Sequence, residues 1–366
     1  MKVKLGELTK IRTGKLDANA SSPDGEYPFF TCSKEPLKIS SYSYDCECVL
    51  VAGNGDLNVK YYNGKFDAYQ RTYIIEDNSN GRLYLPYLYY FMNGYVEELR
   101  KLSIGGVIKY IKLRNLTDAL IELPDIETQK YIVSILSKIK ELIDSRYQEL
   151  KILENLIKAR FVEMFGDPET NSKGWAEISL SEKLNVLGGY AFKSDQFEET
   201  GGIPVLRIGN INSGYFKPVN MVYWKEDRSL ERYAMYPGDL VMSLTGTVGK
   251  DDYGNVCILG NAYEMYYLNQ RNAKLELKEG LDKYYLAELL KFSQVKKKLT
   301  GISRGVRQAN ISNKDILNLV APIPPMELQQ QFANFVEQIA KSKATVQKAL
   351  DETQLLFDSL MQQYFG

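Results

Sequence analysis

The pattern of apolar residues is clearest in Glu127–Phe165, a stretch with no Gly and no Pro. Apolar side chains recur there every three or four residues, which predicts one helix with an apolar stripe. At 1.5 Å per residue this helix would be roughly 58 Å long, far longer than one globular core requires. Its other faces carry Lys, Glu, Asp and Arg. We therefore expect a second long helix to lie along it.

A second stretch with this pattern, Glu327–Phe365, ends the chain and supplies the expected partner. Pairing the two apolar stripes predicts a coiled-coil seam. The residues expected in this seam are Ile132, Ile135, Ile139, Leu153, Phe332, Phe335, Ile339 and Leu350.

The chain repeats itself with an offset of 200 residues. Phe165-Gly166 matches Phe365-Gly366, Gln129 matches Gln329, and Gln70-Arg71 matches Gln270-Arg271. Such self-similarity indicates a tandem duplication of one domain and one long helix. Two copies of one unit are usually related by a two-fold axis, which favours antiparallel helices with one domain at each end. The alternative, a parallel pair, would place both domains at one end.

Short β-branched and aromatic runs separated by Gly, Asn and Asp precede each long helix, as is typical of strands and turns. A helical stretch follows each set, at Leu85–Lys101 and Leu281–Leu299. We predict an α+β fold with a pseudo-two-fold duplication, in which a pair of long antiparallel coiled-coil helices separates two globular domains. The predicted boundaries are 1–125 for the first domain, 126–166 for the first helix, 167–325 for the second domain and 326–366 for the second helix.

The composition excludes several kinds of chemistry. The chain contains no His, so Ser-His and Cys-His catalysis and His-based metal sites are excluded. Its four Cys do not suggest a disulfide framework, and a zinc site is not expected. No apolar run is long enough to span a bilayer and no signal peptide is recognisable, so we expect a cytoplasmic protein without membrane contact.

The order of domains and helices resembles the specificity (S) subunits of type I restriction-modification enzymes. The similarity extends over nearly the whole chain, and the architecture carries it more than any short motif. The segments with the greatest resemblance are Arg114–Leu136, Ala159–Pro168, Pro237–Lys250, Tyr267–Arg271, Gly301–Ser312 and Ser312–Val336. The first copy departs from the pattern at Ser103–Lys112, SIGGVIKYIK, which lacks the Arg and Gln residues of SRGVRQANI in the second copy.

This resemblance implies a subunit with no catalytic centre and no cofactor of its own. Each domain would be a target-recognition domain that reads one half of a split site in double-stranded DNA. The paired helices would fix the gap between the halves and dock two methyltransferase subunits, which bind S-adenosylmethionine. Restriction subunits would add translocation and cleavage driven by ATP and Mg²⁺. The seam residues named above are the expected docking region.

Under this interpretation the DNA contacts should come from polar side chains in the loops of both domains. Arg suits guanine, Asn or Gln suits adenine, and Lys, Thr and Tyr can hold phosphates. The alternative for most of them is a solvated loop, and for Gln270-Arg271 it is a hydrogen bond within the domain. The candidates are Asn54, Asn58, Lys60, Tyr61, Tyr62, Lys65, Gln70, Arg71, Arg207, Asn210, Asn212, Thr245, Thr247, Lys250, Gln270, Arg271, Arg304, Arg307, Gln308 and Asn310.

Two other functions remain open at the level of sequence. A DNA-modifying enzyme with built-in recognition domains would need an Asn/Asp-Pro-Pro-aromatic clamp, and Pro324-Pro325 does not fit that pattern. A structural coiled-coil adaptor would explain the helices but not the two Tyr-rich domains. The balance of 46 basic and 46 acidic residues predicts weak DNA binding by the chain alone, because phosphate neutralisation dominates affinity. Basic partner subunits would supply the rest.

Overall fold

The computed structural model describes residues 2–248, 250, 252–301 and 308–366. The chain forms two compact units: unit 1 is Met1–Glu149 with Val346–Gly366, and unit 2 is Leu150–Thr345. Both units mix helices and strands, which gives the predicted α+β class. The division falls inside the two long helices, α4 (Ile126–Phe165) and α10 (Met326–Phe365). Each unit therefore contains one globular domain and one segment of each long helix.

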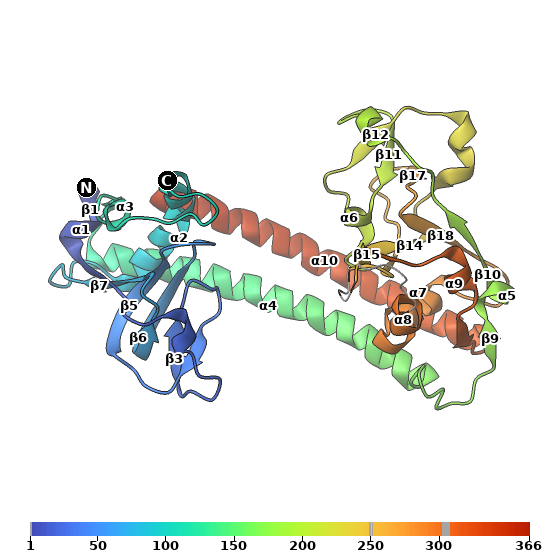
Figure 1. Ribbon diagram of the computed structural model, residues 1–366, viewed down its shortest axis with the longest axis horizontal. Helices are drawn as coiled ribbons and strands as arrows, with labels where there is room; N and C mark the ends of the chain where they lie inside the picture. The colour runs from blue at the N-terminus through green and yellow to red at the C-terminus, as the bar shows by residue number, and fades with distance from the viewer. Residues whose placement is uncertain (1, 249, 251, 302–307) are drawn as a thin grey trace. The chain divides into compact units, whose positions relative to one another are not determined.

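Unit 1 is built on a six-stranded sheet in the order β2-β7-β5-β6-β3-β4, antiparallel except where β3 runs parallel to β6. Its strands are β2 (Thr9–Thr13), β3 (Tyr27–Phe30), β4 (Leu37–Ile39), β5 (Tyr44–Ala52), β6 (Val59–Ala68) and β7 (Thr72–Asp77). Helix α2 (Leu85–Leu102) packs against β5 and β6 (Figure 1). The start of α2 is favoured by Pro86, whose fixed φ suits the first helical turn.

Shorter elements complete unit 1. A two-stranded ribbon joins β1 (Lys2–Lys4) to β8 (Leu120–Glu122), just before α4. The remaining elements are α1 (Leu5–Leu8), η1 (Ala18–Ala20) and α3 (Leu113–Thr117).

The segments of α4 and α10 in unit 1 run antiparallel. Ile132 and Leu136, near the start of α4, belong to the same apolar cluster as Leu360 and Tyr364, near the end of α10. Further along, the Arg146 guanidinium donates a hydrogen bond to the backbone carbonyl of residue 349. The antiparallel arrangement favoured by the repeat is thus confirmed.

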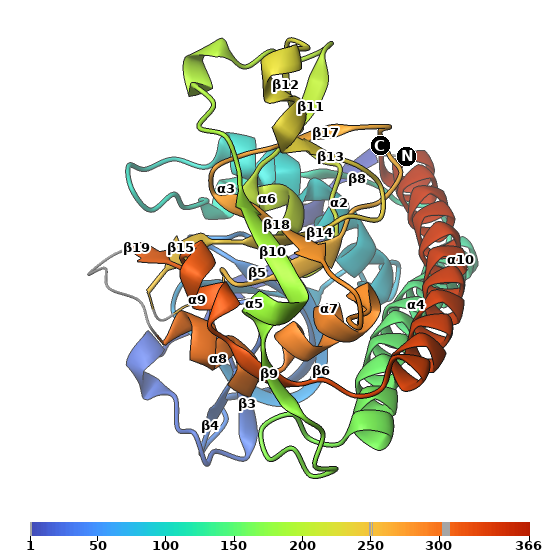
Figure 2. The ribbon, with the colours of Figure 1, turned by 90° about the vertical axis from the view of Figure 1, so that its right-hand side faces the viewer.

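Unit 2 contains two four-stranded sheets, in the orders β10-β18-β14-β16 and β12-β11-β17-β13 (Figure 2). Their strands are β10 (Leu184–Gly188), β11 (Ile203–Leu206), β12 (Val222–Trp224), β13 (Ala234–Met235), β14 (Leu240–Ser243), β16 (Val256–Ile258), β17 (Tyr266–Leu268) and β18 (Asn272–Leu277). Two ribbons pair β15 (Thr245–Thr247) with β19 (Gln308–Asn310) and β9 (Glu177–Ser179) with β20 (Val320–Pro322). The short helices are α5 (Leu180–Lys183), η2 (Ser194–Gln196), α6 (Ile208–Ile211), η3 (Arg228–Tyr233) and α9 (Asn313–Leu317).

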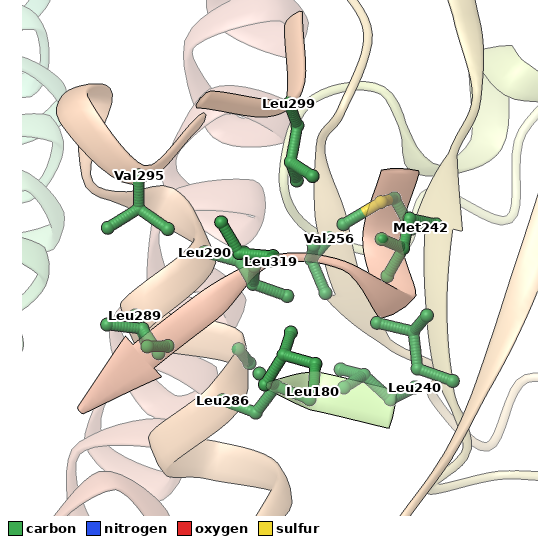
Figure 3. Packing of buried hydrophobic residues seen from close by; sticks show 14 of the residues in the cluster. Leu180, Leu240, Met242, Val256, Leu286, Leu289, Leu290, Val295, Leu299 and Leu319 are labelled. Carbon is green, nitrogen blue, oxygen red and sulfur yellow. The ribbon is translucent and has the colours of Figure 1, made fainter. Parts of the chain in front are cut away.

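The main core of unit 2 lies between the first sheet and helices α7 (Lys283–Lys291) and α8 (Ser293–Thr300). Figure 3 shows Leu240, Met242 and Val256 of the sheet facing Leu286 and Leu290 of α7. The end of α4 joins this core, because the Phe161 ring stacks on that of Tyr285 with centroids 5.3 Å apart. In this unit too the long helices are antiparallel, since Phe161 also packs on Phe332 near the start of α10.

The duplication extends to buried hydrogen bonds. The amide of Gln129 accepts from the Tyr84 N–H and donates to the carbonyls of Arg82 and Pro124. Gln329 accepts from the N–H of residue 282 and donates to the carbonyls of residues 280 and 324. Both side chains are fully buried. Each glutamine therefore fixes the start of a long helix to the turn that precedes α2 or α7.

Candidate nucleic-acid interface

The turn between β17 and β18 presents two of the predicted contacts in unit 2. Backbone hydrogen bonds hold this turn: Gln270 N donates to Tyr190 O at 2.9 Å, and Arg271 O accepts from Leu244 N at 2.8 Å. Asn272 is buried and donates to Leu206 O at 2.7 Å. The side chains of Gln270 and Arg271 are exposed. The turn is thus a rigid base from which an amide and a guanidinium project.

Arg271 lies where two hollows of the surface meet. One, of about 680 Å³, is lined by Arg207, Asn220, Asn269 and Gln270 as well as Arg271. The other, of about 280 Å³, is lined by Arg271 and by residues of β15 and the segment after α6. In the part of the chain that the structure describes, the Arg271 guanidinium has neither an ion pair nor a hydrogen bond. It is therefore available to an acceptor in either hollow.

Asn210 was predicted to contact DNA, but the structure gives it an internal role. Its side chain is buried, accepts from Arg207 N at 2.9 Å and donates to the carbonyls of Lys217 and Val219 at 3.0 Å each. A buried amide with all these partners has little left to offer a base. Asn210 therefore holds the loop that contains Lys217 and Val219. Arg207 remains exposed, and its guanidinium donates to Asn220 O at 2.6 Å.

Asn212, Thr245 and Thr247 line the smaller hollow beside Arg271. The Thr245 hydroxyl is buried and has no partner among the described residues. Thr247 N donates to the Asp252 carboxylate at 2.8 Å, and this bond lowers the pKa of Asp252. An ionised carboxylate at this edge would repel phosphate, so the hollow suits a base edge better than the DNA backbone.

The ribbon of β15 and β19 carries two further candidates. Asn310, opposite Thr245, is exposed, and Gln308 stands opposite Thr247 in the strand register. A Cβ at Gly246 would collide with Asp252 and Tyr253, so only Gly fits there. Arg304 and Arg307 lie outside the described residues.

Lys250 borders a third and larger hollow, of about 820 Å³, under α8. Two of its lysines are paired with carboxylates, Lys291 with Glu288 at 2.9 Å and Lys343 with Glu154 at 2.8 Å. The lysines along its lining are Lys158, Lys250, Lys291, Lys296, Lys297 and Lys343. The lining is thus basic overall, as a phosphate-binding surface requires.

Unit 1 repeats the turn seen in unit 2. Gln70 N donates to Leu16 O at 2.8 Å, and Arg71 O accepts from Gly53 N at 2.8 Å. These bonds match those of Gln270 and Arg271, and both side chains are again exposed.

Three other predicted residues of unit 1 lie near Arg71. The Asn58 amide donates to Cys32 O at 2.8 Å, and the Cys32 thiol contacts Arg71 O at 3.6 Å. Lys60 donates to the Asn58 side chain, and its partial burial lowers its pKa. Asn54 follows Gly53 and is bridged to Tyr110. These contacts bring Asn54, Asn58, Lys60 and Arg71 onto one surface.

Tyr61, Tyr62 and Lys65 have other surroundings, although they belong to the same strand, β6, as Lys60. Tyr61 donates to Glu47 at 2.8 Å, and burial followed by this bond raises its pKa to about 12. Tyr62 packs on the rings of Phe30 and Phe66, and Lys65 lies over the Tyr42 ring. The strand thus divides the predicted group, and these three residues do not join the surface around Arg71.

Sequence reasoning did not select the hairpin Ile104–Tyr110, which lies beside Asn54. Its tip residues Val107 and Ile108 are exposed, with relative accessibilities of 105% and 63%. The signal was present in the sequence, because two β-branched apolar residues follow Gly105-Gly106 where a polar loop would be expected.

The predicted seam residues of the long helices are buried or half-buried. Ile132, Ile139, Phe332, Ile339 and Leu350 are buried, whereas Ile135, Leu153 and Phe335 are half-buried.

A partner could reach other apolar residues on the same helices. Tyr131 and Leu142 of α4 in unit 1 are exposed, as are Ile152 and Leu156 of α4 in unit 2. In each unit these side chains are exposed, whereas the predicted seam residues are buried or half-buried. In the described ranges no helix is long and apolar enough to cross a membrane.

Comparison with known proteins identifies relatives over most of the chain. The family model described as the type I restriction modification DNA specificity domain matches residues 1–155 and 172–353. The type I restriction enzyme EcoDI specificity subunit of Escherichia coli is 26% identical over 396 residues, which cover 98% of this chain and 85% of that protein. The MjaVIII specificity subunit of Methanocaldococcus jannaschii is 26% identical over 383 residues, covering 95% and 89%.

Solved structures show the same fold. The S subunit of a type I restriction-modification system from M. genitalium superimposes with a TM-score of 0.64 at 17% identity, covering 100% of this chain and 96% of that one. A chain from a structure on complex assembly and conformational transition of the type I R-M system gives a TM-score of 0.54 at 17% identity, covering 100% and 97%.

Proposed function

The chain belongs to the family of type I restriction-modification DNA specificity domains, and on this premise we propose that it reads a bipartite DNA site, one half with each unit. It is a non-catalytic subunit. The observation that carries the proposal is the turn at Gln70-Arg71, which recurs at Gln270-Arg271 with the same backbone bonds and the same exposed side chains. Two equivalent recognition turns suit a site made of two halves.

The side chains on these turns have the chemistry of base recognition. A guanidinium can donate two parallel hydrogen bonds to guanine O6 and N7, and an amide can pair with adenine N6 and N7. In unit 2 the hollow shared by Arg271, Asn212 and Thr245 would receive the base edges. Lys250 and Lys297, which are exposed at the larger hollow, would hold phosphates.

The long helices would carry the other subunits of the enzyme. Their seam is internal, so the exposed apolar residues of α4 would dock two methyltransferase subunits, to which restriction subunits attach. S-adenosylmethionine, ATP and Mg²⁺ would then be bound by those partners. Because its proposed target is chromosomal DNA, we assign the protein to the cytoplasm.

The central experiment is to map DNA methylation in cells with and without this chain. We expect one bipartite motif to lose methylation when the chain is absent. The purified chain, given DNA and S-adenosylmethionine alone, should transfer no methyl groups. Methyl transfer by the chain alone would overturn the recognition-subunit proposal in favour of a DNA-modifying enzyme.

Substitution of Ile152 by Glu should prevent co-purification with the methyltransferase. Ile152 is exposed on α4, so a charge there is tolerated by the free chain but is costly once buried against a partner. Lys151→Glu, at the neighbouring exposed position, is the matched control. Pull-down of the methyltransferase by each variant measures the effect. Equal recovery with Ile152→Glu and wild type would contradict the docking role.

Replacing Lys250 or Lys297 by Ala should weaken binding of the assembled complex to all DNA sequences alike. Each lost phosphate contact should reduce the slope of log K against log salt by about 1, without changing the preference among sequences. Lys173→Ala, in the exposed loop after α4, is the control. Salt titrations on cognate and unrelated duplexes measure both quantities. A loss confined to the cognate duplex would instead place these lysines in base recognition.

A further inference from the structure

The hairpin Ile104–Tyr110 of unit 1 lies between α2 and α3 and has an apolar tip. Val107 is fully exposed, and Ile104 and Ile108 are also exposed. Because neighbouring apolar side chains are seldom presented together on a short loop, the tip is suited to a partner that covers it.

Backbone hydrogen bonds hold this hairpin in place. Ile104 and Tyr110 exchange two bonds, of 3.0 and 2.9 Å, and Gly105 turns the chain with a φ of 121°. At its base, Gly55 N donates to Lys109 O at 3.0 Å and Ile111 N donates to Gly53 O at 2.9 Å. The tip is thus carried on a short loop that the Ile104–Tyr110 bridge closes and that backbone bonds tie to residues 53 and 55.

The base of the hairpin is continuous with the candidate interface of unit 1. Gly53, which accepts from Ile111, also donates to the carbonyl of Arg71. Asn54, the next residue, is bridged to Tyr110. A partner that contacts Arg71 and Asn54 is therefore close to the hairpin.

The charge around the hairpin is basic and so complements the phosphates of DNA. The stretch 99–117 contains basic residues but neither Asp nor Glu. Lys109 and Lys112 form no ion pair within the described ranges, whereas Arg100 and Arg114 are paired with carboxylates. Two free ammonium groups beside an apolar tip can hold phosphates on either side of a groove.

We propose that this hairpin enters the major groove of the half-site read by unit 1 and that Val107 and Ile108 contact thymine methyl groups there. The inference rests on the function proposed above and adds the chemistry of one contact. The major groove is wide enough for a two-stranded ribbon, so it can admit a loop closed by a single bridge, and the thymine C5-methyl is the apolar group that this groove displays. Unit 2 has Arg304 and Arg307 in the corresponding stretch of sequence, so apolar recognition would be confined to one half-site.

The test replaces single thymines in the cognate duplex by deoxyuridine, which removes only the methyl group. Binding is measured for the complex with its methyltransferase subunits, using wild type, the double variant Val107→Ser with Ile108→Ser, and Leu37→Ser as an exposed apolar control on β4. For wild type and control we expect a loss of about fourfold at one or two thymines of one half-site, the value of one buried methyl. The double variant should have lost this sensitivity at the same positions.

Three results would overturn the proposal while leaving sequence-specific DNA recognition intact. The first is a cognate site without thymine, and the second is deoxyuridine sensitivity that persists in the double variant. The third is that the double variant no longer binds the methyltransferase subunits but keeps the DNA preference of wild type. The last would make the tip a protein contact. Failure of the proposed function is distinguishable, because wild type would then prefer no DNA sequence.

Discussion

Replacing Gln329 by Leu is expected to lower the free energy of unfolding of unit 2 by about 2–5 kcal/mol, because buried backbone groups lose their partners. The Gln329 amide accepts from the N–H of residue 282 at 2.8 Å and donates to Pro324 O at 2.7 Å. A third bond, of 3.3 Å, reaches the carbonyl of residue 280. Leu has a similar volume but restores none of these bonds, so polar atoms would remain unsatisfied in the core.

Urea denaturation measures the change in the free energy of unfolding. Amide hydrogen exchange, followed peptide by peptide, locates the destabilised segments. Exchange should accelerate in the turn before α7 and at the start of α10. Gln330→Leu, the same substitution at the next and exposed position, is the control and should change stability by less than about 0.5 kcal/mol. Gln129→Leu should affect the equivalent turn of unit 1. A destabilisation by Gln329→Leu no larger than that of the control would show that water or rearrangement replaces the lost bonds.

The two glutamines illustrate what the sequence could predict. Periodic apolar residues located both long helices, expected at Glu127–Phe165 and Glu327–Phe365 and found at Ile126–Phe165 and Met326–Phe365. Helix periodicity is a local property, and so it is readable from sequence. The repeat also marked Gln129 and Gln329 as equivalent. It could not show that they are buried, because two of the three partners of each glutamine come from a turn more than 40 positions earlier.

The candidate DNA contacts were less predictable than the helices, because their surroundings also depend on residues distant in sequence. Arg207 and Asn210 lie at the start of and within the short helix α6 and were equal candidates, yet only Asn210 is enclosed by carbonyls of residues that follow it. Tyr61 is diverted from the surface around Arg71 by Glu47 on the adjacent strand. Strand alternation and register decide such cases, and composition does not carry that information.

The second large effect is expected for Arg271→Ala, which should weaken binding of the assembled complex to its cognate site by about 1–3 kcal/mol if the guanidinium reads a base. The Arg271 guanidinium lies at the junction of two hollows and has no partner among the described residues, so its removal should cost little stability. Binding to unrelated duplexes should change far less than binding to the cognate one.

Arg271→Lys separates the two possible roles of this side chain. Lys keeps the charge but lacks the planar fork, so it can hold a phosphate but cannot bond guanine through two parallel donors. A base contact therefore predicts that Lys restores little of the lost affinity, and that one position of one half-site becomes degenerate in the methylated motif. Nearly full rescue by Lys, with the motif unchanged, would assign Arg271 to the phosphate backbone.

Arg71→Ala supplies the internal comparison, because its turn has the same backbone bonds in the other unit. If the two turns serve separate half-sites, Arg71→Ala should relax the other half of the motif, and the losses should add in the double variant.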